Sequence, residues 1–248
     1  MSHITTRLGK PPPDPADSQR RTPQTAGHRG PGGPPSLAIA GIGADVSKTL
    51  RAAPGVQQLP IKAMALFVRP DFLSAAECQG LIDMIDANAQ PSDLYGSKED
   101  VSYRTSYSCN VDRWDPLVLE IDTRICALTG IDARHGETLQ GQRYTQGQEF
   151  KPHHDFFHVD QAYWPAQEAH AGQRTWTVMI YLNQPEGGGE TAFKHAKISI
   201  APRVGLLLAW NNCGPDGAPN LETTHAGLPV TAGAKYIVTK WYRERPWI

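Results

Sequence analysis

This sequence lacks a long hydrophobic run and a surplus of charge of either sign. The apolar stretch at residues 37–46 is too short to span a bilayer, and the N-terminus has neither the basic start nor the apolar core of a secretory signal. The formal net charge of −1 gives no reason to expect a nucleic-acid partner or an anionic membrane surface. These absences predict a cytoplasmic protein without a nucleic-acid or membrane partner.

Cysteine is also scarce, and no CxxC pair is present. The four cysteines are scattered along the chain, at Cys78, Cys109, Cys126 and Cys213. Such spacing fits reduced thiols in the cytoplasm better than a disulfide framework or a zinc site. We therefore expect them to be small buried apolar residues.

The first quarter of the chain lacks a periodic apolar pattern. It is rich in proline and glycine, as in Pro11–Pro13 and Gly30–Pro35, and such a segment cannot bury enough surface to offset its ordering entropy. We expect residues 1–58 to form a disordered N-terminal tail, although residues 36–52 could form a short helix. The remaining residues, 59–248, are enough for one globular domain with a sizeable core.

Two helices are predicted at the start of this domain. Ser74 and Glu77 have the spacing of a capping box, which begins a helix that ends near Ala89. Asp115 is a good N-cap, Pro116 suits the first helical turn, and Gly130 can end the second helix.

The pattern after residue 150 is typical of strands. Short runs rich in β-branched and aromatic residues are bounded by turn residues, at Thr175–Leu182, Ile198–Ile200, Gly205–Trp210 and Lys235–Tyr242; Met64–Val68 is an earlier strand of this kind. The spacing predicts a mostly β fold with flanking helices, in which the strands form an antiparallel double-sheet jelly roll.

A candidate metal site lies between these groups of elements. On a strand, residues i and i+2 share a face, so His153 and Asp155 can reach one ion while His154 points the other way. With His225, 70 residues after Asp155, they make the two-histidine, one-carboxylate set that binds ferrous iron and leaves positions open. An HxD pair by itself is a weak signal, so other residues must support this interpretation.

Further motifs support it by resemblance to a known family. Seven segments occur in the order seen in prolyl 4-hydroxylases: Arg104–Ser106, Gly136–Gln140, Tyr144 with Gly147-Gln148, Pro152–Asp155, Gly172–Thr175, Gly188–Thr191 and His225–Gly227. Over roughly residues 62–245 the chain resembles a bacterial member of this group of iron and 2-oxoglutarate-dependent dioxygenases.

The resemblance implies a fold and a reaction. Residues 59–248 would be a dioxygenase domain with a double-stranded β-helix core of the cupin-like jelly-roll type. Its cofactors and cosubstrates would be Fe(II), 2-oxoglutarate and O2, with ascorbate able to rescue oxidised iron. It would hydroxylate a prolyl residue in a peptide or protein while decarboxylating 2-oxoglutarate to succinate and CO2.

The resemblance also assigns the catalytic and metal-binding residues. His153, Asp155 and His225 match the family's three iron ligands, and His154 occupies the variable position between two of them. Related halogenases lack the carboxylate, so the presence of Asp155 favours hydroxylation.

The cosubstrate needs a cation, because its distal carboxylate would be costly to bury without a partner. Lys235, ten residues after His225, resembles the family lysine that pairs with this carboxylate, whereas Lys240 and Arg243 on the same strand do not match its spacing. Thr191 matches a threonine that helps to bind it.

Two tyrosines, Tyr144 and Tyr181, are candidate phenol donors to the cosubstrate, or else core aromatics. One position departs from the family, since Phe150 stands where many relatives have a tyrosine that donates to the cosubstrate. Either Tyr144 substitutes for it, or the affinity for 2-oxoglutarate is altered.

Substrate binding is assigned to Arg174 and Trp241, which match residues near the prolyl substrate in relatives; Arg174 could instead form a structural salt bridge. The loop at residues 157–171 is long enough to act as a lid, and residues 93–104 are a second candidate loop.

Two other functions stay open on the sequence. One is the same chemistry on another residue, a free amino acid or a small metabolite. The other is a noncatalytic or zinc-binding β-barrel that kept the fold. The oligomeric state is not determined by the sequence.

Overall fold

The computed structural model describes residues 33–92 and 103–248. These described residues contain four α-helices, with the bounds α1 (Leu37–Ala52), α2 (Ala75–Asn88), α3 (Pro116–Thr129) and α4 (Trp164–His170). Two short 3-10 helices within the same described residues are η2 (Ala133–His135) and η3 (Leu221–Thr223). No helix of the described part is long and apolar enough to cross a bilayer.

The strands form three antiparallel sheets. The largest has the order β1 (Gln57–Gln58), β2 (Leu66–Arg69), β11 (Leu207–Asn211), β7 (Arg174–Tyr181), β14 (Ala234–Arg243), β5 (Gln140–Thr145), β4 (Tyr107–Asn110) and β3 (Gln90–Pro91). The second has the order β10 (Ile198–Ile200), β9 (Thr191–Phe193), β12 (His225–Gly227) and β6 (Phe150–His153). The third pairs β13 (Val230–Ala232) with β8 (Gly187–Gly188).

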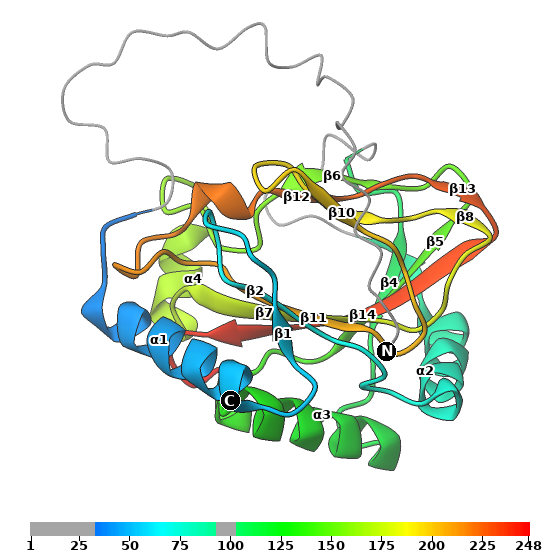
Figure 1. Ribbon diagram of the computed structural model, residues 1–248, viewed down its shortest axis with the longest axis horizontal. Helices are drawn as coiled ribbons and strands as arrows, with labels where there is room; N and C mark the ends of the chain where they lie inside the picture. The colour runs from blue at the N-terminus through cyan, green and yellow to red at the C-terminus, as the bar shows by residue number, and fades with distance from the viewer. Residues whose placement is uncertain (1–32, 93–102) are drawn as a thin grey trace, which may run out of the picture.

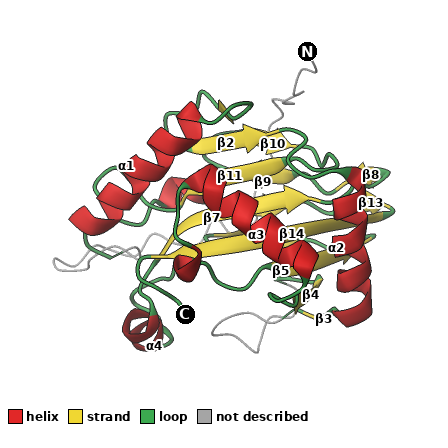
Figure 2. Cartoon of the chain, turned by 90° about the horizontal axis from the view of Figure 1, so that it is seen from below, coloured by secondary structure: helices red, strands yellow, loops and turns green. Residues whose placement is uncertain are grey.

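These elements stack in three layers. Helices α1, α2 and α3 cover one face of the eight-stranded sheet (Figure 2), and the four-stranded sheet lies over its other face (Figure 1). The predicted fold class, an antiparallel double-sheet jelly roll with flanking helices, is confirmed. The predicted strands agree with β2, β7, β10, β11 and β14 to within two residues at each end.

The helix-covered face of the large sheet contains one of two apolar cores. Leu81 and Ile85 of α2 and Ile121 of α3 pack with Trp176 and Val238 of the sheet, and all five are completely buried. Full burial of one such side chain contributes about 1.5–3 kcal/mol relative to exposure. This core therefore supplies much of the energy that fixes the helices on the sheet.

Both predicted helices of the domain are confirmed together with their caps. Ser74 and Glu77 form the reciprocal capping box of α2. In α3 the Asp115 side chain accepts a hydrogen bond from the Leu117 backbone N–H, and Gly130 ends the helix in the left-handed conformation with φ of 74°. Residues that satisfy the free ends of a helix locally can be recognised without tertiary information.

The space between the two large sheets contains the second core. Its members include Leu66, Tyr144, Tyr181, Phe193 and Trp210. Side chains alternate between the two cores along each strand, because successive residues of a strand point to opposite faces.

Helix α1 corrects the expected N-terminal tail. Ser36 caps the helix, and Ile39, Gly43, Val46 and Leu50 form a buried stripe at spacings of three and four residues. Val46 and Leu50 belong to the helix-side core, so the prediction of disorder is wrong for residues 36–58 and the short helix considered for 36–52 is present. The proline-rich stretch before it obscured this stripe. Residues 1–32 lie outside the described residues.

The loop predicted at residues 157–171 is also only partly a loop, because α4 occupies seven of its residues. Arg243 anchors the C-terminal end of α4, since its guanidinium donates hydrogen bonds to the Gln167 and Gly172 carbonyl oxygens at 3.2 and 2.6 Å. Most of the other candidate loop, residues 93–102, lies outside the described residues.

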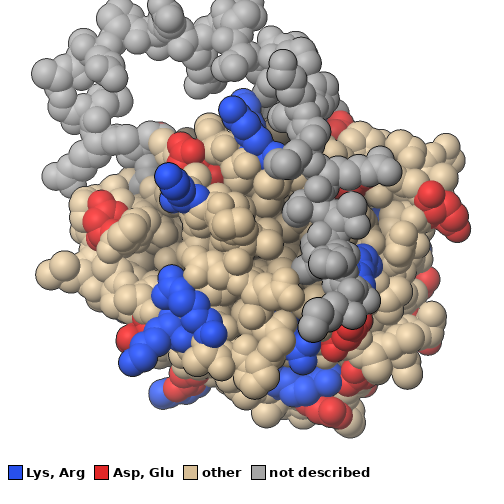
Figure 3. All heavy atoms as spheres, viewed as in Figure 1, with Lys and Arg blue, Asp and Glu red and all other residues tan. Residues whose placement is uncertain are grey.

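Charged side chains are mixed on the face viewed in Figure 3. Lys and Arg lie beside Asp and Glu around a central area formed by other residues. Charge on this face is thus balanced, in keeping with the net charge of −1. The four cysteines, all described, are free thiols, and burial raises the pKa of Cys78 to about 11.

Candidate metal centre

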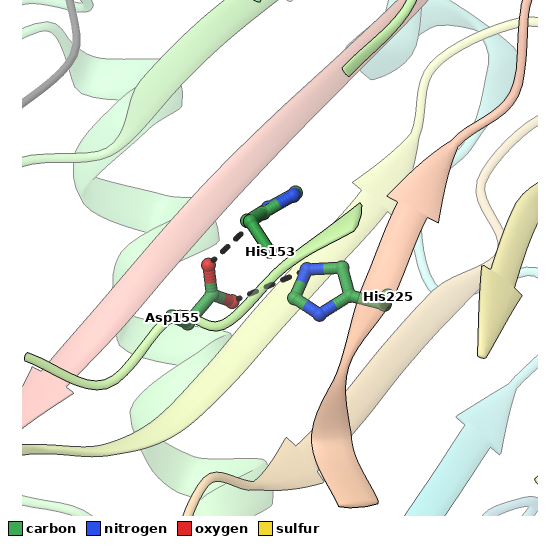
Figure 4. A group of neighbouring side chains, drawn as sticks. All are labelled: His153, Asp155 and His225. Atoms are coloured by element: carbon green, nitrogen blue, oxygen red, sulfur yellow. Dashed lines mark ion pairs between the residues drawn. The ribbon is translucent and has the colours of Figure 1, made fainter. Parts of the chain in front are cut away.

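Two neighbouring strands of the four-stranded sheet position the histidines. His153 ends β6 and His225 begins β12, and the antiparallel register places these two residues directly opposite each other. Asp155 follows two residues after His153, in the turn beyond the strand (Figure 4). The strand pair therefore brings together residues that are 72 positions apart in the sequence.

The three side chains converge on one point. The Nε2 atom of His153 lies 3.8 Å from Asp155 Oδ1, and the Nε2 atom of His225 lies 3.7 Å from Asp155 Oδ2. All three ligand atoms lie within 4.8 Å of one another, and among the described residues this is the only such group of histidine, cysteine and carboxylate side chains. Two imidazole nitrogens and one carboxylate oxygen are a donor set that suits Fe(II).

Backbone carbonyls orient both imidazoles. The Nδ1 atom of His153 lies 2.8 Å from the Lys151 carbonyl oxygen, and that of His225 lies 2.9 Å from the Thr223 carbonyl oxygen. Each Nδ1 must carry a proton to donate there, so each Nε2 is the ring nitrogen that faces Asp155 and is available as a metal ligand. Burial lowers the pKa of His153 to about 3, which keeps the ring neutral as metal binding requires.

A hydrogen-bonded chain fixes the carboxylate. The Thr177 hydroxyl donates to Asp155 Oδ2 at 2.7 Å, and the Asn212 amide donates to the Thr177 hydroxyl at 2.9 Å. Burial would raise the pKa of Asp155, but His225, His153 and Thr177 together lower it below its usual value. Neither Thr177 nor Asn212 is marked by a local sequence motif; Thr177 on β7 and Asn212 directly after β11 reach the site only because these two strands pack side by side.

His154 lies apart from this group. Its Nε2 atom is 3.0 Å from the Leu221 carbonyl oxygen and 2.7 Å from the Thr224 hydroxyl. The ring therefore packs against the η3 turn, on the other side of the strand from the converging ligands.

A pocket between the sheets extends inward from the three side chains. It is lined by the triad together with Tyr144, Phe150, Met179, Thr191, Trp210, Lys235, Thr239 and Trp241, among others. Lys235 is only 2% exposed, and burial lowers its pKa to about 7. No carboxylate of the described residues lies within 4.0 Å of its Nζ atom, so this buried cation can still accept an anionic partner.

The two rival cations on β14 are paired elsewhere. Lys240 Nζ lies 2.7 Å from Asp122 of α3, on the helix side of the sheet. Arg243 Nη1 lies 3.3 Å from Glu137, and the guanidinium also donates to the Gly172 carbonyl oxygen. Only Lys235 of these three lines the pocket.

Two tyrosine rings lie near Lys235. The Thr191 hydroxyl accepts a hydrogen bond of 2.6 Å from the Tyr181 hydroxyl, and Lys235 Nζ lies 5.5 Å from the centre of the Tyr181 ring. The centre of the Tyr144 ring lies 5.2 Å from Nζ, and the Tyr144 hydroxyl donates to Gln142 at 2.8 Å. The ring of Phe150 stacks on His153 with centroids 3.5 Å apart.

A second pocket opens outward from the triad. Its walls include Phe157, His158, Tyr163, Arg174 and Trp241. The Arg174 guanidinium donates two hydrogen bonds to Glu137, at 2.7 and 2.6 Å, and lies 4.2 Å from the centre of the Trp241 ring. The structural salt bridge that the sequence left as an alternative is therefore present, and it also supports Trp241 at the pocket wall.

Comparisons with known proteins agree with this geometry. The profile of the 2OG-Fe(II) oxygenase superfamily matches residues 139–243. The chain is 34% identical over 196 residues to the human prolyl 4-hydroxylase subunit alpha-3, covering 75% of this chain and 36% of that subunit. It is 33% identical over 199 residues to the probable prolyl 4-hydroxylase 3 of Arabidopsis thaliana, covering 71% of this chain and 68% of that protein.

A solved structure shares the fold. The viral collagen prolyl hydroxylase of Paramecium Bursaria Chlorella virus-1, in its 2OG complex, superposes with a TM-score of 0.57 at 28% identity, covering 71% of this chain and 94% of that one. The chain spans about a third of the length of the animal subunits that it matches.

Proposed function

This chain belongs to the prolyl 4-hydroxylase family of the 2OG-Fe(II) oxygenase superfamily, and from that premise we propose that it hydroxylates a prolyl residue in a peptide or protein. The reaction would convert 2-oxoglutarate and O2 to succinate and CO2. The observation that carries the proposal is one pocket that contains both the His153, Asp155 and His225 group and the buried cation Lys235.

In this proposal His153, Asp155 and His225 hold Fe(II), because their converging atoms offer nitrogen and oxygen donors of the required kind. The bound iron would supply O2 activation and the oxidation of the substrate C–H bond. The chain's own contribution is to keep the His153 imidazole neutral, to orient both imidazoles through the Lys151 and Thr223 carbonyl groups, and to fix Asp155 through Thr177.

The inner part of the pocket would bind 2-oxoglutarate. Lys235 as an ammonium would pair with the distal carboxylate, and the Thr191 hydroxyl beside it would donate a further hydrogen bond. Tyr181 would orient that hydroxyl. Tyr144, whose hydroxyl lies in the same pocket, would supply the phenol that Phe150 lacks.

The outer pocket would bind the prolyl substrate. Phe157, Tyr163 and Trp241 provide aromatic walls suited to a pyrrolidine ring, and the Glu137 pair keeps Arg174 beside Trp241. We extend the dioxygenase domain to residues 36–248 because α1 packs into its core. A cytoplasmic location and a use of ascorbate stay predictions.

The test measures succinate from 2-oxoglutarate with Fe(II) present, together with oxygen incorporation into a proline-containing peptide by mass spectrometry. We expect both only with the peptide, and neither with free proline or with Zn²⁺ in place of Fe(II). His153→Ala should abolish both products, whereas His195→Ala, an exposed histidine that lines neither the inner nor the outer pocket, should retain them. Turnover of a free amino acid alone would support the small-metabolite alternative, and activity unchanged in His153→Ala would refute the site.

A further inference from the structure

Prolines are concentrated at the start of this chain. Eight of the 21 prolines lie within the first 35 residues, at Pro11, Pro12, Pro13, Pro15, Pro23, Pro31, Pro34 and Pro35. The other 13 belong to residues 54–246, which the fold holds in place. Any proline that is to enter this chain's own pocket must therefore come from the N-terminal segment, defined here as residues 1–35.

The point at which this segment joins the fold is fixed. The Ser36 backbone N–H donates to the Asp216 carbonyl oxygen at 3.0 Å. Gly217, with φ of +78°, packs so closely on Ser36 that an added Cβ would lie 2.0 Å from the Ser36 carbonyl oxygen. Three residues earlier, a Cβ on Gly33 would lie only 2.9 Å from the Val159 side chain.

This junction lies beside the outer pocket. Val159 directly follows Phe157 and His158, which line that pocket, and it is four residues from Asp155. Four extended residues span at most about 14 Å, so Gly33, in contact with Val159, lies within roughly 20 Å of Asp155. The segment thus joins the fold beside residues of the outer pocket wall, within roughly 20 Å of the metal centre.

Chain length decides which prolines can reach the centre. Pro23 is ten residues before Gly33 and can be carried up to about 35 Å from it, and Pro11–Pro15 can be carried further. Pro34 and Pro35 are exposed but lie between two anchored residues, Gly33 and Ser36. A reactive group tethered over such a span has an effective concentration on the order of millimolar, which favours reaction within one molecule.

We propose that the N-terminal segment is a substrate of the chain's own site, with hydroxylation within one molecule at Pro11–Pro15 and Pro23. The proposal rests on the proposed prolyl hydroxylation. The reaction is balanced without another reductant: one atom of O2 enters the prolyl C–H bond as a hydroxyl, and the other enters succinate as 2-oxoglutarate is oxidised and loses CO2.

Trypsin separates the candidate prolines into three peptides. Cleavage after Arg7, Arg20, Arg21, Arg29 and Lys48, with none at Lys10 because proline follows it, yields residues 8–20, 22–29 and 30–48. The full chain is incubated with Fe(II), 2-oxoglutarate and ¹⁸O2, then digested and analysed by mass spectrometry. We expect ¹⁸O in the first and second peptides and none in the third, which contains Pro31, Pro34 and Pro35.

The same preparation is also given a separate proline-containing peptide. If that peptide is hydroxylated while residues 8–20 and 22–29 stay unlabelled, the further inference is wrong and the proposed function stands. If neither is hydroxylated and no succinate forms, the proposed function itself fails. Asp155→Ala serves as the inactive control, in which no peptide should be labelled.

Two further measurements test reaction within one molecule. The labelled fraction per unit time should not change across a wide range of protein concentrations, and a rate that rises in proportion to concentration would overturn the intramolecular proposal. Replacement of all five prolines should remove the label; the substitutions are Pro11→Ala, Pro12→Ala, Pro13→Ala, Pro15→Ala and Pro23→Ala. The matched control, Pro34→Ala with Pro35→Ala, should leave it unchanged.

Discussion

Strand β14 separates two buried regions of this molecule, the pocket inside the barrel and the layer beneath α1, α2 and α3. Each region contains a lysine from the same strand. Lys235 faces the pocket without a carboxylate of the described residues within 4.0 Å, and burial lowers its pKa to about 7. Lys240, five residues later and 3% exposed, faces the helices and forms an ion pair with Asp122 at 2.7 Å.

The difference shows which buried charges serve folding and which serve binding. Desolvation of an ammonium costs several kcal/mol unless a partner compensates it. On the helix side the chain supplies that partner itself. In the pocket the chain supplies no such partner. The uncompensated desolvation of Lys235 therefore favours the binding of any ligand that carries a carboxylate. We therefore expect changes in the pocket to affect binding and turnover, and changes under the helices to affect stability.

The largest expected contrast removes a carboxylate on each side. Asp155→Ala should lower turnover by at least about a thousandfold, because a metal ligand is lost. Asp122→Ala should leave Lys240 buried without a partner and lower the free energy of unfolding by roughly 3 kcal/mol, with turnover per folded molecule retained. Steady-state kinetics and urea unfolding of both variants measure the contrast, and a loss of turnover in folded Asp122→Ala would break it.

The second contrast removes each lysine. Lys235→Met should raise the KM for 2-oxoglutarate by about a hundredfold, since loss of one member of a buried charge pair costs 2–5 kcal/mol. The metal-free variant should be at least as stable as the parent, because an unpaired buried ammonium is gone. Lys240→Met should show the opposite, with reduced stability and an unchanged KM. A Lys235→Met variant with reduced stability and an unchanged KM for 2-oxoglutarate would contradict the assignment of Lys235 to cosubstrate binding.

A smaller effect is expected from two buried threonines. Thr177→Val removes the hydroxyl that orients Asp155 and should weaken metal binding by about ten- to a hundredfold, as is usual for groups behind a metal ligand. Thr129→Val is the matched control, because its hydroxyl donates to the Ile125 and Cys126 carbonyl oxygens and accepts from the Ile131 backbone N–H, at the end of α3. Titration with Mn²⁺, a redox-stable substitute for Fe(II), measures the metal affinity of each variant. Equal Mn²⁺ affinities of the parent and Thr177→Val would contradict a role of Thr177 in orienting Asp155.

The smallest expected effect is a dependence of the KM for 2-oxoglutarate on pH. Binding of a carboxylate requires the Lys235 ammonium, whose pKa in the free protein is about 7. Above that pH, the KM for 2-oxoglutarate should rise by up to about tenfold per unit, the equivalent of 1.36 kcal/mol. Lys235→Arg, which stays charged, should have a flat profile whatever its absolute KM. A parent profile as flat as that of the arginine variant would exclude Lys235 as the partner.

The same pKa has a consequence for stability with the opposite sign. The unfolded chain retains this proton up to the ordinary pKa of 10.5, whereas the folded chain releases it near 7. Between these two values the unfolded state binds more protons, so the metal-free protein becomes more stable as the pH rises. Lys235→Met should lack this increase.

Local features of the sequence were sufficient for much of the fold. The capping box at Ser74 and Glu77 and the caps of α3 specified both helices to within a residue. Periodicity located the main strands. It indicated a short helix at residues 36–52 but not that α1 belongs to the domain, since a single buried stripe beside a proline-rich segment was outweighed by the average composition. It also did not reveal the seven-residue helix α4, whose C-terminal end is tied by Arg243 from another strand.

The candidate site divides in the same way. The sequence by itself indicated that His153 and Asp155 can reach one ion, distinguished Lys235 from Lys240 and Arg243 by its spacing from His225, and indicated which chemistry those residue types suit. Only the tertiary structure decided that His225 lies opposite His153, that Thr177 and Asn212 fix Asp155, and that Glu137 pairs with Arg174. The physical reason is that side-chain direction follows from local backbone geometry, whereas strand register and buried partners depend on the packing of the whole chain.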